Sequence, residues 1–165
     1  NLVGCALTTR KIEIMSDGSP WRPVIHIKDV CSAFISGITA PIELISGQSF
    51  NVGINDGNYT IKTLAEIAKN LISNCDLIFL NQHTDPRTYK ISFKKIHTIL
   101  KNYFKPNWNL NDGGLELVEF LKRNNFNENL FRGRKCNRLK QLKYLLNSNL
   151  IDNDLIWKKN KTLKI

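Results

Sequence analysis

The stretch DGSPWRPVIHIKDVCSAF, residues 17–34, changes its local pattern twice within a short length. It opens with Asp, Gly, Ser and Pro, residue types that together favour a tight turn. Residues 24–27 follow in extended form, because Pro23 disfavours the helical backbone region for Arg22. From Lys28 onward, apolar residues recur at helical spacing, with Asp29 in the first turn. The stretch therefore predicts a turn, a short extended segment and then a helix.

The segments around this stretch alternate between strand and helix patterns. Short apolar runs predict strands at residues 11–15, 49–53 and 76–80. Helical spacing predicts helices at residues 2–7, 28–40, 60–72 with Thr60 as cap, 92–100, a segment that starts near Asn111 as cap, and 137–146 with Leu139, Leu142, Leu145 and Leu146 inward. This alternation indicates an α/β fold.

We expect three parts along the chain. Residues 1–110 are predicted to form a substrate-binding portion with elements that complete a larger sheet, residues 111–157 a helical segment, and residues 158–165 a basic tail. The helix at 29–38 and the strand at 50–52 are the elements that we expect to complete that sheet.

The net charge of +10 is concentrated after residue 83, where Lys and Arg far outnumber Asp and Glu. A basic half of this kind can attract nucleic acid or another polyanion. The alternative is a general compositional preference for Lys, Asn and Ile, in which Lys simply fills solvated positions. We favour the compositional explanation, because the aromatic residues are spaced like core residues rather than like a stacking platform.

The four cysteines are Cys5, Cys31, Cys75 and Cys136, and no two of them are close in sequence. This spacing suggests neither a zinc site nor a disulfide framework, so we predict reduced thiols in a cytoplasmic protein. No apolar run is long enough to span a bilayer, and we expect no membrane partner.

Six segments follow one another in a recognisable order: NLV at 1–3, IEIMSDGSPWRPVIHIKDVCSAF at 12–34, FNVG at 50–53, YTIKTLAEIAKNL at 59–71, DPRTYKISFKKI at 85–96 and PNWNLNDGGLELVEFL at 106–121. Together they resemble the C-terminal part of an NAD-dependent sugar-nucleotide epimerase/dehydratase, of the extended short-chain dehydrogenase/reductase family. The resemblance implies a substrate-binding portion that lacks most of the Rossmann domain.

The resemblance also implies which side chains bind the substrate. It places Arg22 and Arg87 at the diphosphate of a nucleotide-activated sugar, and Asn1 at the same phosphates. A guanidinium offers a planar fork of donors that suits phosphate oxygens. His26 and Asp29 are interpreted as structural residues rather than as an acid or base.

Two motifs of that family are missing from this sequence, namely a glycine-rich phosphate loop and a Tyr-x-x-x-Lys pair. We therefore expect NAD to bind the intact enzyme and not this chain alone, and we expect the chain alone to be catalytically inactive. A chain that carries an N-terminal Rossmann half is an expected partner. Two alternatives stay open: a non-catalytic remnant that serves as an assembly surface, and a basic module that binds polyanions or nucleic acid.

Overall fold

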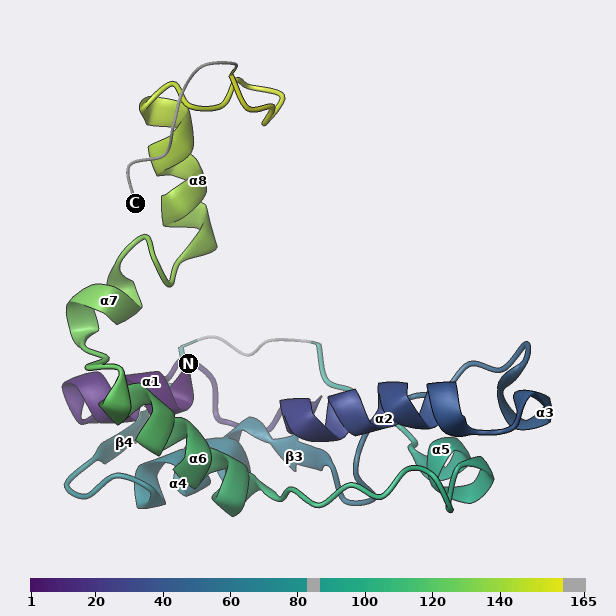
Figure 1. Cartoon of the computed structure of the whole chain (residues 1–165). Coiled ribbons are helices and arrows are strands. Elements are labelled where there is room, and N and C mark those ends of the chain that lie inside the picture. The colour runs from purple at the N-terminus through teal and green to yellow at the C-terminus, as the bar shows by residue number, and fades with distance from the viewer. Residues whose placement is uncertain (83–86, 159–165) are drawn as a thin grey trace. The chain divides into compact units, whose positions relative to one another are not determined.

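The computed structural model describes residues 1–82 and 87–158 (Figure 1). It divides into two units, Asn1–Phe120 and Leu121–Ile165, which we call the N-terminal and C-terminal units. The three parts expected from the sequence remain a prediction, and the tail lies outside the described residues from 159 onward.

The N-terminal unit alternates helices and short strands, as the sequence predicts. Its elements are α1 (Leu2–Thr9), β1 (Lys11–Ile14), β2 (Trp21–Pro23), α2 (Ile27–Thr39), α3 (Ile42–Ile45), β3 (Asn58–Thr60), α4 (Ile61–Asn70), β4 (Asp76–Phe79), α5 (Lys94–Ile99) and α6 (Leu110–Arg123), the last of which continues into the C-terminal unit. The predicted strands at 11–15 and 76–80 are confirmed as β1 and β4. The short elements β3 and α3 were not predicted.

Two small sheets organise the N-terminal unit. Strand β1 pairs with β4 in parallel, and β2 pairs with β3 in antiparallel orientation. The side chains of β1 alternate, so Ile12 and Ile14 are buried while Lys11 and Glu13 are exposed. Helix α4 connects the two sheets, and Thr60 caps it by accepting a hydrogen bond from the Thr63 amide at 3.0 Å, as predicted. The first core cluster forms here: Ala6, Ile12, Ile14, Ala65, Ala68, Ile72, Cys75 and Val118.

A second core cluster packs around α5 without a sheet. It contains Ala33, Ala40, Phe93, Ile96, Leu100 and Phe104. The predicted strand at 49–53 is wrong, because these residues have an irregular backbone. Two of their polar groups bond to the α5 region instead: the Gly53 carbonyl oxygen lies 2.8 Å from His97 Nε2, and the Asn51 side-chain Nδ2 donates to the Ser92 carbonyl at 3.3 Å. Residues 49–53 therefore have the sequence pattern of a strand but pair with no neighbouring strand.

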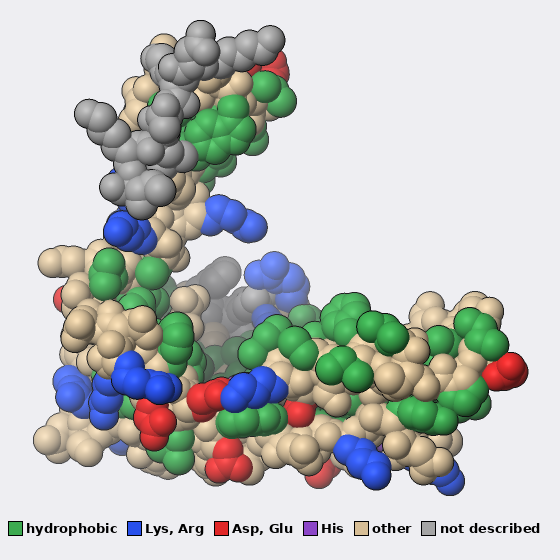
Figure 2. All heavy atoms as spheres, in the orientation of Figure 1, with side chains coloured by type: hydrophobic (Ala, Val, Ile, Leu, Met, Phe, Trp, Pro, Cys, Tyr) green, Lys and Arg blue, Asp and Glu red, His purple; other side chains and the backbone are tan. Residues whose placement is uncertain are grey.

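Helix α2 buries a different face from the one its large apolar residues suggest. The buried positions are Asp29, Ala33 and Ser36. Phe34 is 73% exposed and Ile38 is 82% exposed. Figure 2 shows hydrophobic side chains gathered along this helix. The small buried residues let α2 pack closely on the α5 cluster, while its bulky apolar side chains face outward.

The C-terminal unit contains α7 (Glu128–Arg132), which was not predicted, and α8 (Arg138–Asn147), which was. Asn127 and Asn137 cap these helices by accepting the backbone N–H groups of Leu130 and Lys140. Leu139 was predicted to point inward, which is wrong, because it is 60% exposed. It lies in the first turn of α8, ahead of the half-buried leucines that follow.

The turn at residues 16–20 clamps the start of α4. The Pro20 and Gly18 carbonyls each accept a backbone hydrogen bond at 2.9 Å, from Ile61 and Lys62 respectively. Gly18 has a φ of +82°, and a Cβ there would lie 2.7 Å from the Phe79 ring. Only glycine therefore fits this position without strain.

Replacing this glycine tests the clamp. We expect Gly18→Ala to lower the free energy of unfolding by about 1–3 kcal/mol, through backbone strain and the contact with Phe79. Gly37→Ala in α2 is the matched control, because a Cβ added at Gly37 would meet nothing within 4 Å. The control should raise stability by about 0.5–1 kcal/mol through helix propensity. Urea denaturation measures both changes, and equal effects would contradict the clamp.

Candidate functional site

Arg22 lies in β2 and reaches the segment that begins at Arg87. Its NH1 group donates hydrogen bonds to the Trp21 carbonyl at 2.7 Å and to the Arg87 carbonyl. Its guanidinium carbon also lies 5.4 Å from the centroid of the Tyr89 ring. Two arginines that are 65 positions apart in the sequence are therefore adjacent.

The segment after Arg87 continues to follow β2. The Trp21 amide donates to Thr88 Oγ1 at 3.0 Å. The Lys90 ammonium lies over the Trp21 ring, 3.6 Å from its centroid. Each aromatic ring thus supports a cation from the other segment, an arrangement that stabilises both by cation–π attraction. We call Trp21, Arg22, Arg87, Tyr89 and Lys90 the arginine cluster.

The structure brings together two of the three predicted ligands. Arg22 and Arg87 share the arginine cluster, whereas Asn1 lines an apolar cavity. Asn1 precedes α1, and its side chain makes no capping hydrogen bond. Asp85, two positions before Arg87, lies outside the described residues.

The apolar cavity has a volume of about 310 Å³. Its walls come from α1, α4, α6 and residues 24–26, and most of the lining side chains are aliphatic. Asn1, His26 and Asn109 are its polar lining residues. Such a cavity suits an apolar group and offers few charges to a phosphate.

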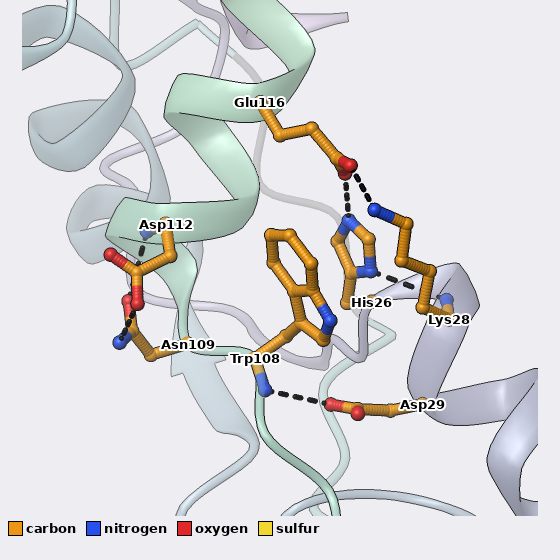
Figure 3. A network of polar contacts seen from close by, with 7 residues as sticks. All are labelled: His26, Lys28, Asp29, Trp108, Asn109, Asp112 and Glu116. Atoms are coloured by element: carbon orange, nitrogen blue, oxygen red, sulfur yellow. Dashed lines mark hydrogen bonds and ion pairs between the residues drawn. The ribbon is translucent and has the colours of Figure 1, made fainter.

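His26 sits beside this cavity at the centre of a polar network (Figure 3). Its Nδ1 accepts the backbone N–H of Lys28 at 3.2 Å and so caps α2. Its Nε2 lies 2.7 Å from Glu116, whose carboxylate also pairs with Lys28. Because Nδ1 acts as an acceptor, the proton of the neutral ring belongs on Nε2, which donates to Glu116. The ring stacks on Trp108 with centroids 4.1 Å apart. His26 is therefore hydrogen-bonded, as the sequence predicts, and its interpretation as a structural rather than a catalytic residue stays a prediction.

Asp29 anchors the segment that leads into α6. It is 3% exposed, and its carboxylate accepts the backbone N–H groups of Asn107 at 3.0 Å and Trp108 at 3.1 Å. The predicted cap of α6 was wrong by two residues. Asn109, not Asn111, accepts the Asp112 amide at 2.9 Å. Trp108 and Glu116 were not predicted, because their partners lie about 80 to 90 positions away in sequence.

Within residues 1–82 and 87–158, no group of three His, Cys, Asp or Glu side chains is arranged to hold a metal ion. His97 is occupied by the Gly53 carbonyl. Over the same residues, no helix combines the length and the apolar character needed to cross a bilayer.

Glu116 is the group from which a pH dependence of the network is expected. The hydrogen bond from Lys28, with a further one from His26, holds the pKa of Glu116 below its usual value. A lowered pKa means that the stabilisation is present above the ordinary pKa near 4.5 and is lost as pH falls through the folded-state pKa.

We therefore expect Glu116→Gln to be less stable than the wild type at pH 7, and the difference to shrink as the pH falls to about 3. Urea denaturation at a series of pH values measures this. Glu119→Gln removes the same charge from an exposed position of α6 and controls for net charge. A wild-type advantage that is unchanged at pH 3 would contradict the role of Glu116.

Comparison with known proteins gives two kinds of match. A family model described as the NAD dependent epimerase/dehydratase family matches residues 1–53. Among solved structures, UDP-glucuronic acid 4-epimerase from Bacillus cereus, solved with UDP-glucuronic acid and NAD, is 20% identical and has a TM-score of 0.59 over 74% of this chain and 38% of its own.

Two further solved structures match the chain over a similar share of its length. The dTDP-glucose 4,6-dehydratase from Bacillus anthracis, solved with NAD, is 23% identical, with a TM-score of 0.50 over 74% of this chain and 38% of its own. A protein named DdhaC is 26% identical, with a TM-score of 0.54 over 70% of this chain and 33% of its own. The chain therefore spans less than two fifths of the length of these proteins. Residues 1–53 match the NAD dependent epimerase/dehydratase family, and the chain has a small α/β fold that corresponds to part of the fold of extended short-chain dehydrogenase/reductase epimerases.

Proposed function

We propose that the arginine cluster binds the diphosphate of a nucleotide-activated sugar, as the substrate-binding, C-terminal portion of an NAD-dependent epimerase/dehydratase. The observation that carries this proposal is the contact between Arg22 and the Arg87 carbonyl. It puts two guanidinium-bearing residues from distant segments at one place, where they can act as a clamp on one diphosphate.

The surroundings of Arg22 suit this role physically. The clamped turn at residues 16–20 fixes the strand that carries it, and Tyr89 supports its guanidinium. A pre-positioned guanidinium loses less conformational entropy when it binds a phosphate. Lys90 adds a third positive charge over Trp21, so the cluster can balance a doubly charged diphosphate. Asn1 remains a predicted third ligand from the start of α1.

The residues of this chain do not fit the pyrophosphate of NAD. Glycines that open a helix next to a strand are the usual cradle for that group. Here Gly113 and Gly114, in the first turns of α6, pack directly against other side chains. A Cβ added at Gly113 would lie 3.0 Å from the His26 ring, and one added at Gly114 would lie 2.4 Å from Leu71. We therefore derive no hydride or proton transfer for this chain. Its proposed contribution is to hold and orient the substrate. Binding energy from contacts away from the reacting atoms can help to orient those atoms for reaction.

The exposed apolar face of α2 supports the proposal that another folded portion packs against this chain. Ile27, Phe34, Ile35 and Ile38 are all more than half exposed. A helix face of this kind is normally covered by other structure. We propose that a dinucleotide-binding portion, in the same or another polypeptide, packs on this face and supplies NAD and the catalytic groups.

Substitution of Arg22 tests the proposed arginine clamp on the diphosphate. We expect Arg22→Gln to weaken binding of UDP-glucuronic acid or dTDP-glucose by about 10- to 100-fold in calorimetry, because a charge-assisted hydrogen bond is worth about 1.5–3 kcal/mol. Arg22→Lys should recover only part of the affinity, since it keeps the charge but loses the planar fork.

Arg10→Gln is the matched control. Arg10 lies at the opposite end of β1 from the clamped turn and donates to the Ser73 carbonyl, so the same loss of charge occurs away from the cluster. Its affinity should stay near that of the wild type. Equal losses in the two variants, or no binding by the wild type, would contradict the clamp. Wild-type affinity in both Arg22→Gln and Arg87→Gln would favour the non-catalytic remnant.

A further inference from the structure

The positive charge of the chain is concentrated in the C-terminal unit. Residues 121–165 hold twelve of the 24 Lys and Arg residues but only three of the 14 Asp and Glu residues, which gives this unit a charge of +9 and leaves +1 for residues 1–120. The arginine cluster lies in the other unit. The cations of the arginine cluster are therefore not among these twelve.

Within this unit, the charge is concentrated further. Residues 129–151 contain six Lys and Arg residues and no Asp or Glu. Five of the six are exposed on α7, α8 and their connection: Arg132, Lys135, Arg138, Lys140 and Lys143. Figure 2 shows blue side chains where the chain passes from α7 into α8. We call these five residues the basic surface.

Contacts inside the unit hold the basic surface in place. The Arg134 guanidinium lies over the Tyr144 ring, 4.1 Å from its centroid, and Arg134 also donates to Gln141 at 3.0 Å. These contacts tie the connection to α8. Lys140 donates to the Arg132 carbonyl at 2.7 Å and so ties the end of α7 to the start of α8. The exposed cations are therefore presented from an ordered scaffold.

The two cations at the start of α8 are unfavourably placed unless an anion lies near them. Like charges within one short segment repel one another, and Arg138 and Lys140 lie in the first turn of α8, where no acidic residue offsets them. Phosphates that lie against the surface offset both the repulsion between the cations and their unfavourable position at the start of a helix. Because these cations lie on one surface held by internal contacts, charge complementarity favours a polyanion over the compositional explanation preferred from the sequence alone.

An anionic membrane fits these observations less well than a nucleic acid does. Leu142, Leu145 and Leu146 of α8 are half-buried inside the unit, so Leu139 is the one exposed leucine that this basic helix offers for insertion. The exposed apolar residues Leu155, Ile156 and Trp157 lie in a separate segment beside Asp152 and Asp154, and an anionic headgroup layer would repel these carboxylates.

We propose that the basic surface binds the phosphate backbone of a nucleic acid without reading its sequence. Lys and Arg side chains make such contacts, and they carry no base specificity by themselves. No exposed aromatic ring lies among the five cations, so base stacking is not part of the proposal. This binding is independent of the sugar-nucleotide function and can hold or fail separately.

The salt dependence of binding tests the proposal on the full chain. With about five phosphate contacts, the plot of log affinity against log salt has an expected slope of about −3.5 for single-stranded RNA and about −4.5 for duplex DNA. Between about 50 and 200 mM salt, affinity for a labelled 25-nucleotide RNA should therefore fall by roughly 100-fold. Fluorescence anisotropy with two RNA sequences of equal length should give the same affinity.

A triple variant locates the surface. Arg138→Gln, Lys140→Gln and Lys143→Gln together should reduce the magnitude of the RNA slope by about 2, since each lost phosphate contact is worth about 0.7. Gln keeps good helix propensity, and circular dichroism checks that α8 remains folded. The control triple is Lys69→Gln, Lys101→Gln and Lys105→Gln, which removes the same charge from exposed positions of the N-terminal unit.

The expected result is a reduced slope in the α8 triple and a wild-type slope in the control. Equal reductions in both would overturn the proposal, because they would indicate a response to net charge alone. Absence of RNA and DNA binding at 50 mM salt would also overturn it. Binding to phosphatidylserine vesicles without binding to RNA or DNA would overturn it in favour of a membrane surface.

Discussion

The clamped turn at residues 16–20 is the constraint on which the N-terminal unit depends. It reverses the chain after β1 and bonds it to the first residues of α4 through the carbonyls of Gly18 and Pro20. Asp17 closes the turn by accepting the backbone N–H and the hydroxyl of Ser19, which lowers the pKa of its carboxyl. Strand β2 then has only one position beside β3, with Trp21 opposite Thr60.

The location of the arginine cluster follows from this turn. The turn fixes the start of β2, and the Val24 amide donates to the Gly57 carbonyl just after its end. Arg22 therefore meets the segment that begins at Arg87, and Trp21 meets Lys90. A second fixed point lies farther along the chain, where the buried carboxylate of Asp29 bonds the segment before α6. That bond brings Trp108 onto His26 and Glu116 within reach of His26 and Lys28. Two anchored segments thus position both the candidate ligands and the polar network.

The sequence predicted what local chemistry decides. Turn residues predicted the turn at 16–20, Thr60 predicted the start of α4, and alternation predicted β1. The bonds from that turn to α4 were not predicted. What it missed depends on distant partners. Residues 49–53 carry a strand pattern but bond to the α5 region, and Phe34 and Ile38 follow helical spacing but face outward, since small residues fill the tight contact of α2. Glu116 carried no local signal, because its role exists only once α6 lies beside His26.

The three tryptophans provide the most direct test of where an anionic ligand binds. Trp21 belongs to the arginine cluster, Trp108 lines the apolar cavity and Trp157 lies in the C-terminal unit. With fluorotryptophan incorporated and each signal assigned by a Trp→Phe variant, fluorine NMR can follow a titration with uridine diphosphate. If the arginine cluster binds the diphosphate, the Trp21 signal shifts and saturates with added ligand, while the signals of Trp108 and Trp157 stay in place. A saturable shift at Trp108 or Trp157, with Trp21 unchanged, would contradict it.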